Sequence, residues 1–240
     1  MDRHKRHWKA GALALAAGAA ICAGAAWALQ GELETTHYEV PLPAGLEDLD
    51  GLTIAQISDV HSAGIQEELR SALEQAAPDL IVFTGDLVNR DAGITVLEDE
   101  AAQLWRNGEQ VNLIGLLDLS FHPRGLEKAR EELSDHVQDL LIHGALNVVL
   151  SHRPSLIEEY EASGADLVFS GHAHGGQFRL PFVGGLVAPN QGLFPKYDSG
   201  LYTEGNTNMI VSRGIGNSIL PFRFNNRPEV ILIELKATPN

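Results

Sequence analysis

Short, continuous apolar runs alternate with amphipathic stretches along most of the chain. Strands are expected at the apolar runs 52–57, 80–84, 94–97, 111–116, 146–150, 167–170, 209–212 and 230–235. Helical spacing of apolar residues predicts helices over 66–77, 126–141 and 154–162. Continuous apolar strands that alternate with helices indicate an α/β sheet covered on both faces. The Gly-, Pro- and Asn-rich stretch 181–207 is expected to form long loops.

The first thirty residues follow a different pattern. Residues 1–9 carry a net positive charge, and residues 10–29 are uncharged and mostly Ala, Gly and Leu. Twenty apolar residues at about 1.5 Å each span about 30 Å, the hydrocarbon thickness of a bilayer. Basic residues before the span predict that the N-terminus lies inside and the rest outside. A cleaved signal peptide, with Ala26-Trp27-Ala28 as an A-x-A pattern, is the alternative and would release a secreted protein.

This organisation gives a basic segment at 1–9, a transmembrane anchor or signal peptide at 10–29, and one folded domain at 35–236. The 240 residues are 44% hydrophobic and 20% charged, which is typical of a globular protein. A single cysteine, Cys22, excludes an intrachain disulfide and a cysteine-rich zinc site. The net charge of −15 argues against binding to nucleic acid.

Candidate metal ligands stand where four of the expected strands end. The four strand ends carry Asp59-x-His61, Gly85-Asp86, Ser151-His152 and Gly171-His172-x-His174. Each motif alone is more often a turn, a cap or a satisfied polar residue. Their joint occurrence in order, each at a strand end, points to a ligand site, because open α/β sheets bind ligands at the carboxyl ends of their strands.

The residue types in this set indicate the kind of metal. Residues i and i+2 of an extended chain point the same way, so Asp59 with His61, and His172 with His174, are each expected to face one centre. Imidazoles and carboxylates without a thiolate suit Mn, Fe, Zn or Co better than Mg or Ca. Six ligands are too many for one tetrahedral site and suit two metals that share a carboxylate.

The ordered blocks QISDVH, TGDLV, LSHRP and SGHAHGGQ resemble the calcineurin-like metallophosphoesterases. The resemblance is closer to a membrane-anchored bacterial branch that includes UDP-2,3-diacylglucosamine pyrophosphatase-like proteins and phosphodiesterases, and the tail SRGIGNSILPFRFNNRPEV is similar to that branch. It implies a four-layer αββα sandwich of two mixed sheets. It also implies hydrolysis of phosphoester or pyrophosphate bonds by a hydroxide activated by two metals, on a lipid or sugar-nucleotide substrate such as UDP-2,3-diacylglucosamine.

The resemblance also implies roles for the candidate ligands. One metal would be held by Asp59, His61, Asp86 and His174, and the second by Asp86, His152 and His172. Asp86 would bridge the two metals. No catalytic residue beyond the ligands is assigned.

One block of the family pattern is absent. The family places a Gly-Asn-His block between the GD and LSH blocks, where the Asn ligates the second metal and the His serves the leaving group, and no Gly-Asn-His occurs in this chain. Only residues 85–93 separate the apolar runs LIVFT and ITVL, whereas a parallel β-to-β connection needs a dozen residues or more. About one strand with its helices is therefore expected to be missing. Asn89, close to the gap, is a candidate substitute ligand for a weakened second site.

Three interpretations follow from this gap. In the first, the chain is a metal-dependent phosphohydrolase with impaired activity. In the second, it is a degenerate member that serves as a metal-binding or partner-binding module with little turnover. In the third, the shortened chain is an unstable truncation product or a sequence error, because loss of a sheet strand exposes ladder edges and removes core contacts.

Overall fold

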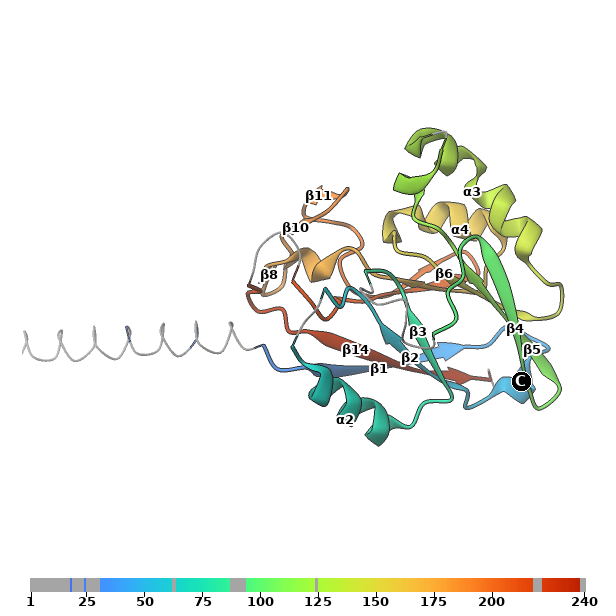
Figure 1. The fold of residues 1–240 in the computed structure, drawn as a ribbon, viewed down its shortest axis with the longest axis horizontal. Helices are drawn as coiled ribbons and strands as arrows, with labels where there is room; N and C mark the ends of the chain where they lie inside the picture. The colour runs from blue at the N-terminus through green and yellow to red at the C-terminus, as the bar shows by residue number, and fades with distance from the viewer. Residues whose placement is uncertain are drawn as a thin grey trace, which may run out of the picture.

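The computed structural model describes residues 31–61, 64–86, 94–123, 125–217 and 222–237, together with Gly18 and Gly24. Two mixed sheets lie face to face (Figure 1). Sheet A has the order β1 (Glu34–Pro41), β14 (Glu229–Lys236), β2 (Thr53–Ile57) and β3 (Leu80–Phe83). Sheet B has the order β12 (Gly200–Glu204), β13 (Thr207–Val211), β7 (Leu167–Ser170), β6 (Leu146–Leu150), β5 (Glu109–Gly115) and β4 (Glu100–Arg106).

Both sheets mix parallel and antiparallel pairs, as the resemblance implies. In sheet A only the β14–β2 pair is antiparallel. In sheet B the outer pairs β12–β13 and β4–β5 are antiparallel and the inner pairs are parallel. The continuous apolar runs predict β2, β3 and β14 of sheet A and β5, β6, β7 and β13 of sheet B, each of which has a parallel partner.

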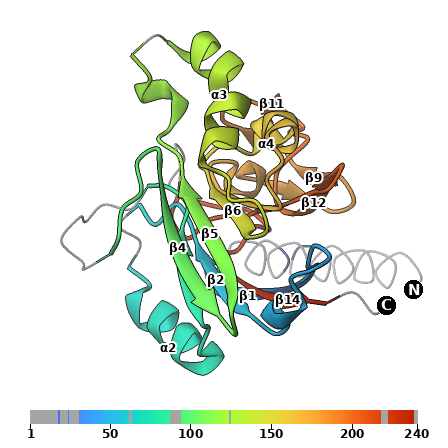
Figure 2. The ribbon, with the colours of Figure 1, turned by 90° about the vertical axis from the view of Figure 1, so that its right-hand side faces the viewer.

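Helices cover the outer face of each sheet, so the domain has four layers (Figures 1 and 2). Helix α2 (Gln66–Ala76) packs Leu69 and Leu73 on Ile57 of sheet A. Helices α3 (Leu126–Leu140) and α4 (Ile157–Ser163) cover sheet B. The main core lies between the sheets and includes Ile54, Val82, Val148, Phe169, Ile210 and Ile231.

The remaining elements are short. The 3-10 helices are η1 (Glu47–Leu49), η2 (Leu119–Phe121), η3 (Pro154–Leu156) and η4 (His174–Gly176). Two small antiparallel hairpins, β8 (Arg179–Leu180) with β9 (Gly184–Gly185) and β10 (Val187–Ala188) with β11 (Gly192–Leu193), follow η4.

Most predicted elements are present to within two residues, but the expected strand at 94–97 is wrong. Residues 94–97 have no regular structure, and Leu97 instead packs against the core between the sheets. A Cβ atom on Gly115 would lie 2.3 Å from the Cβ of Leu97, so the apolar signal there reflects side-chain packing. The sequence also missed the edge strands β1 and β4, whose residues are mainly exposed or half-buried, and it missed β12 inside the expected loops.

The path from β3 to β4 shows why the short connection at residues 85–93 does not require a missing strand. β3 is the last strand of sheet A, whereas β4 is the edge strand of sheet B, so the connection passes from one sheet to the other. A parallel crossover is not needed there, although the Gly-Asn-His block is still absent from the sequence. Residues 87–93, Asn89 among them, lie outside the described residues.

Within the described part of the chain, no helix combines the length and the apolar character needed to cross a membrane. The span expected at 10–29 lies outside the described residues apart from Gly18 and Gly24. The membrane anchor therefore stays a prediction of the sequence.

Candidate metal centre

All six predicted ligands lie where the strands of the two sheets end. Asp59 and His61 follow β2 and Asp86 follows β3, while the three other histidines follow β6 and β7. Among the ligands that follow strands of sheet A, His61 Nε2 lies 3.1 Å from Asp86 Oδ2. Among those that follow strands of sheet B, the ring centroids of His152 and His172 lie 4.7 Å apart. Tertiary structure thus brings four separate motifs to one place.

The ligand atoms form two overlapping groups in which every pair of atoms lies within 4.8 Å. The groups are Asp59 with His61 and His174, and Asp59 with Asp86 and His152. Asp59 Oδ1 lies 3.3 Å from His174 Nε2 and 3.8 Å from His152 Nε2. Asp86 Oδ2 lies 3.1 Å from His61 Nε2 and 3.8 Å from His152 Nε2. Asp86 therefore stands between imidazoles from the two sheets, and Asp59, which belongs to both groups, is placed to be shared as well as Asp86.

The local backbone differs from the extended conformation that the sequence suggested. Five of the six residues have a left-handed φ: 50° at Asp59, 42° at His61, 47° at Asp86, 66° at His172 and 47° at His174. The extended backbone that was assumed for His172 and His174 is therefore wrong. The His174 ring stacks on His61 at 5.2 Å, whereas His172 packs against the other histidine of its sheet. Backbone strain of this kind concentrates at functional sites.

Two glycines allow the two sheets to meet at the centre. A Cβ atom on Gly171 would lie 1.9 Å from Ser58 Oγ and 2.5 Å from Asp59 Oδ2. Gly85 has a φ of +102°, and a Cβ atom there would lie 2.1 Å from His152 Nδ1. No other residue fits at either position, which gives a physical reason for the glycines of the TGD and SGH blocks.

Hydrogen bonds hold two of the ligands in place. Ser58 Oγ donates to Asp59 Oδ2 at 2.6 Å, and the backbone N–H of His172 donates to the same oxygen at 3.1 Å. Asp59 is fully buried. The Nδ1 of His152 lies 3.0 Å from the carbonyl oxygen of Thr84, which only accepts, so Nδ1 carries the proton. This leaves the Nε2 lone pair, which faces both carboxylates, free for a metal.

The charge state of the histidines fits metal binding. Burial, with help from His152 and Arg153, lowers the pKa of His172 to about 4. Burial also lowers the pKa of His174, although Asp59 opposes this. Both rings are therefore neutral at pH 7, and the neutral imidazole is the form that binds metals. Among the described residues, the buried Nδ1 of His174 has no hydrogen-bond partner. The donor set as a whole fits divalent metals of the Mn, Fe, Zn or Co class.

Arg223 is a buried cation beside the centre that the sequence analysis did not single out. Its guanidinium donates to the carbonyl oxygens of Arg213, at 2.8 Å, and Gly216. Burial lowers its pKa to about 10, so the group stays charged at pH 7, with the carboxylate of Asp59 favouring the charge. The sequence feature that could have pointed to Arg223 is its place in the tail SRGIGNSILPFRFNNRPEV, which is similar to the bacterial branch of the family.

Asn190 is a second residue that the sequence missed, because it lies in the stretch expected to be loop. It sits at the turn between β10 and β11, and its Nδ2 lies 2.7 Å from His172 Nε2. An amide from a different part of the chain thus stands beside His172, one of the predicted ligands. The contact orients the His172 ring.

We expect Asn190→Ala to weaken binding of the second metal about 10- to 100-fold, the usual cost of losing a residue that orients a metal ligand. The measurement is titration of the full chain with Mn²⁺ by calorimetry. Asn107→Ala is the matched control, because Asn107 is also an exposed turn asparagine with a left-handed φ, 52° against 59° for Asn190. Equal Mn²⁺ affinities for the two variants would show that Asn190 does not act on the site.

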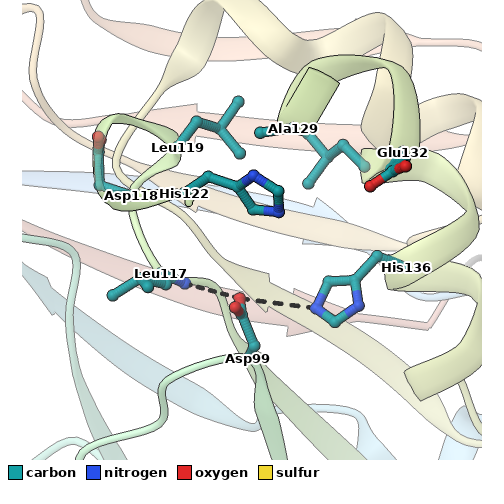
Figure 3. A pocket seen from close by; sticks show the side chains of 9 residues that line it. Asp99, Leu117, Asp118, Leu119, His122, Ala129, Glu132 and His136 are labelled. Atoms are coloured by element: carbon teal, nitrogen blue, oxygen red, sulfur yellow. Dashed lines mark hydrogen bonds and ion pairs between the residues drawn. The ribbon is translucent and has the colours of Figure 1, made fainter. Parts of the chain in front are cut away.

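A cavity of about 120 Å³ lies between η2 and α3 (Figure 3). His122 and His136 both face it, and Asp99 Oδ1 lies 3.6 Å from His136 Nε2. Asp118 lines the same cavity and accepts two hydrogen bonds from Arg153, at 2.8 and 2.9 Å. Arg153 follows His152 in the chain, so this ion pair ties the wall of the cavity to the segment that carries a candidate ligand.

Asp118→Asn should destabilise the fold by about 1.5–3 kcal/mol at pH 7, the usual range for hydrogen bonds to a charged group. Burial alone would raise the pKa of Asp118, but the hydrogen bonds from Arg153 and Ser120 hold it well below its usual range. A lowered folded-state pKa stabilises the protein above the unfolded pKa of about 3.9, and this contribution is lost as the pH falls further. Urea unfolding should therefore show a difference from wild type that is full at pH 5–7 and shrinks below pH 4. A difference independent of pH would contradict this account.

Comparison with known proteins places the fold and the centre in a family. A family profile described as a calcineurin-like phosphoesterase superfamily domain matches residues 52–188, a range that contains all six candidate ligands. The chain therefore belongs to the calcineurin-like phosphoesterase superfamily. The family, and relatives named as a metallophosphoesterase and a phosphodiesterase, identify it as a metal-dependent phosphoester hydrolase.

Three relatives show how far the similarity extends. The uncharacterised metallophosphoesterase YkuE of Bacillus subtilis is 28% identical, and the alignment covers 94% of each chain. The phosphodiesterase YaeI of Escherichia coli is 34% identical over 61% of this chain and 49% of its own length. The UDP-2,3-diacylglucosamine pyrophosphatase LpxG of Chlamydia trachomatis is 28% identical over 62% of this chain and 44% of its own length. The YkuE alignment spans 280 positions, more than the 240 residues here, so that relative carries segments without a counterpart in this chain.

Proposed function

We propose that this chain hydrolyses phosphodiester or pyrophosphate bonds with two divalent metal ions of the Mn, Fe, Zn or Co class. The observation that carries the proposal is the meeting of five candidate ligands in two overlapping groups, with the sixth, His172, packed against His152 at 4.7 Å between ring centroids. We expect the second metal to bind more weakly than the first, because the sequence has no Gly-Asn-His block to supply its amide ligand.

Divalent metals held there would lower the pKa of water and neutralise charge on the phosphoryl oxygens. The residues of the chain hold the ligands for that task. Ser58 fixes the Asp59 carboxylate, and the carbonyl of Thr84 fixes the tautomer of His152. Without the histidine of the missing block, the chain lacks the family's group for serving the leaving group. We therefore expect substrates with good leaving groups, which need no proton, to react fastest.

The names of two relatives suggest the substrate class. One is a phosphodiesterase, and one is named for the pyrophosphate bond of UDP-2,3-diacylglucosamine, a lipid-bearing sugar nucleotide. We propose a lipid or sugar-nucleotide substrate of this kind. We also propose that residues 10–29 anchor the chain in the cell membrane with the folded domain on the extracytoplasmic side, as the basic residues before this span predict.

The test of the hydrolytic proposal is release of p-nitrophenol from bis(p-nitrophenyl) phosphate by the full chain with added Mn²⁺. Removal of metal with EDTA should abolish the rate, and Mn²⁺ should restore it. His174→Ala should lower the rate at least about 10³-fold, since the buried imidazole belongs to the first ligand group. The control is His143→Ala, an exposed histidine outside the centre, which should match wild type. Equal rates for wild type and both variants would overturn the proposal.

The alternative function is a metal-binding or partner-binding module with little turnover. The absent Gly-Asn-His block favours this alternative. Two results together would favour the binding module. Wild type would bind Mn²⁺ and lose this binding in His174→Ala, and wild type would hydrolyse no phosphodiester.

A further inference from the structure

Apolar side chains gather on one rim of the molecule beside the metal centre. We call this the apolar rim and define it by Phe182, Val183, Val187, Leu193, Phe194 and Phe222. All six are exposed, with Phe182 at 109% and Leu193 at 70% of full exposure. Soluble surfaces rarely carry so many neighbouring large apolar groups unless they bind something.

The rim is a built part of the fold. The β10–β11 hairpin pairs Val187 with Leu193, and the N–H of Phe194 donates to the carbonyl of Leu186 at 2.8 Å. Phe222 lies against the same loops, because the ring of Phe222 is 5.6 Å from the ring of Phe178. The exposed side chains of the apolar rim therefore stand on a hydrogen-bonded framework.

The rim adjoins the candidate metal centre. Asn190, at the turn of the β10–β11 hairpin, contacts His172. Asn226, four residues after Phe222, donates to the carbonyl oxygen of His174 at 2.7 Å. A surface that covered the rim would thus lie next to the candidate ligands.

The charge around the rim differs from that of the whole chain. The chain has a net charge of −15, but residues 178–197 contain no Asp or Glu and carry Arg179 and Lys196. Residues 213–227, which include Phe222, also lack carboxylates, and two of their three arginines, Arg213 and Arg223, are bonded within the fold. Apolar side chains in segments without carboxylates, beside an exposed lysine, suit the interface of an anionic bilayer.

The position at which the described chain begins also favours contact of the rim with a bilayer. The N–H of Glu34, at the start of β1, donates to the carbonyl of Pro228 at 2.8 Å, two residues after Asn226. The start of β1 and the β8–β11 loops lie at the same end of the molecule (Figure 1). The described chain therefore enters the domain at the end that carries the rim, and in the sequence the apolar residues 10–29 come shortly before that point.

We propose that the apolar rim docks on the lipid bilayer and presents the metal centre to phosphoesters at the membrane surface. This deepens the proposed function and, for its substrate, rests on it. Phe182 and Phe194 enter the interface, and the exposed Lys196 lies at the level of the headgroups. The net acidic charge does not prevent this contact, because the carboxylates are absent from the segments that touch the lipid.

The first test measures docking and does not need activity. The full chain with Cys22→Ser, which removes its only cysteine, receives a single NBD-labelled cysteine by Phe182→Cys or Phe194→Cys and is placed in phosphatidylcholine/phosphatidylglycerol vesicles. Trp105→Cys is the matched control, since Trp105 is 68% exposed and lies on β4 opposite Gln110, at the amino end of β5, far from the rim. Doxyl-labelled lipid should quench positions 182 and 194 at least twofold more than position 105.

Two results would overturn docking on lipid. One is equal quenching at all three positions. The other is a fluorescence change at 182 and 194 that follows protein concentration in detergent without vesicles, which would assign the rim to a second copy of this chain.

The second test compares two substrates with the same leaving group, bis(p-nitrophenyl) phosphate in solution and hexadecyl p-nitrophenyl phosphate in vesicles. In each, water attacks phosphorus and p-nitrophenolate leaves. The variant Phe182→Ser/Phe194→Ser should keep the rate on the soluble ester and lose at least fivefold on the vesicle-bound ester. An equal loss on both, or no loss on either, would overturn presentation of membrane substrates. If wild type hydrolyses neither ester, the proposed hydrolytic function fails, while the quenching result still decides on docking.

Discussion

Replacing Asp86 by asparagine is expected to lower phosphodiester hydrolysis at least about 10³-fold, equivalent to about 4 kcal/mol of transition-state stabilisation. Asp86 Oδ2 stands between His61 and His152, which come from different sheets. An amide keeps the size of the side chain but removes the negative charge that two neighbouring cations need. We therefore expect the variant to lose affinity for both metals.

The metal content of Asp86→Asn separates two assignments. If Asp86 is the shared ligand, Mn²⁺ titration of the variant should show both sites weakened. If Asp59, which belongs to both ligand groups, is the only shared carboxylate, Asp86→Asn should weaken the second site alone. Asp139→Asn, an exposed position on α3, is the control and should bind metal like wild type. Full activity in Asp86→Asn would contradict both assignments.

Phe169→Ala is expected to destabilise the domain by about 3–5 kcal/mol, because it opens a cavity in a closely packed core. Phe169 is fully buried on β7 in the core between the two sheets. For a domain of this size the loss corresponds to a fall in Tm of roughly 6–20 °C. The effect should reach the metal centre, because β7 leads within three residues to His172.

The measurement is thermal unfolding with and without Mn²⁺. Phe182→Ala is the matched control, since the same side chain is removed from a position that is 109% exposed, and its Tm should stay near that of wild type. A Tm for Phe169→Ala close to that of Phe182→Ala would contradict the assignment of Phe169 to the main core. A large fall would also argue against the view that the shortened chain is an unstable product, because it would show a cooperative core.

The inner strands and the helices were predictable because burial dictates their patterns. Strands such as β6 and β7 are buried on both faces and read as continuous apolar runs, and α3 presents its apolar residues to one side. The edge strands β1 and β4 carry mostly exposed or half-buried residues, so their patterns resemble those of loops. The segment that contains Leu97 shows the opposite error. It was predicted as a strand because it is apolar, but it is irregular, and Leu97 is apolar because it packs on the core.

By itself, the sequence determined the chemistry of the centre. Asp and His residues directly after apolar strands indicate a metal site, because parallel strands deliver their carboxyl ends to one edge. The same reasoning identified the six candidate ligands, whereas the absence of the Gly-Asn-His block followed from the resemblance to the family.

Only the tertiary structure decided how these groups meet, because their contacts join residues that are far apart in the chain. Left-handed turns separate His172 from His174, and Gly85 and Gly171 allow the two sheets to touch. The structure alone placed β3 and β4 in different sheets and brought Asn190 and Arg223 to the centre. It also gathered the apolar rim, since exposure depends on what packs against a side chain, and no local pattern contains that information.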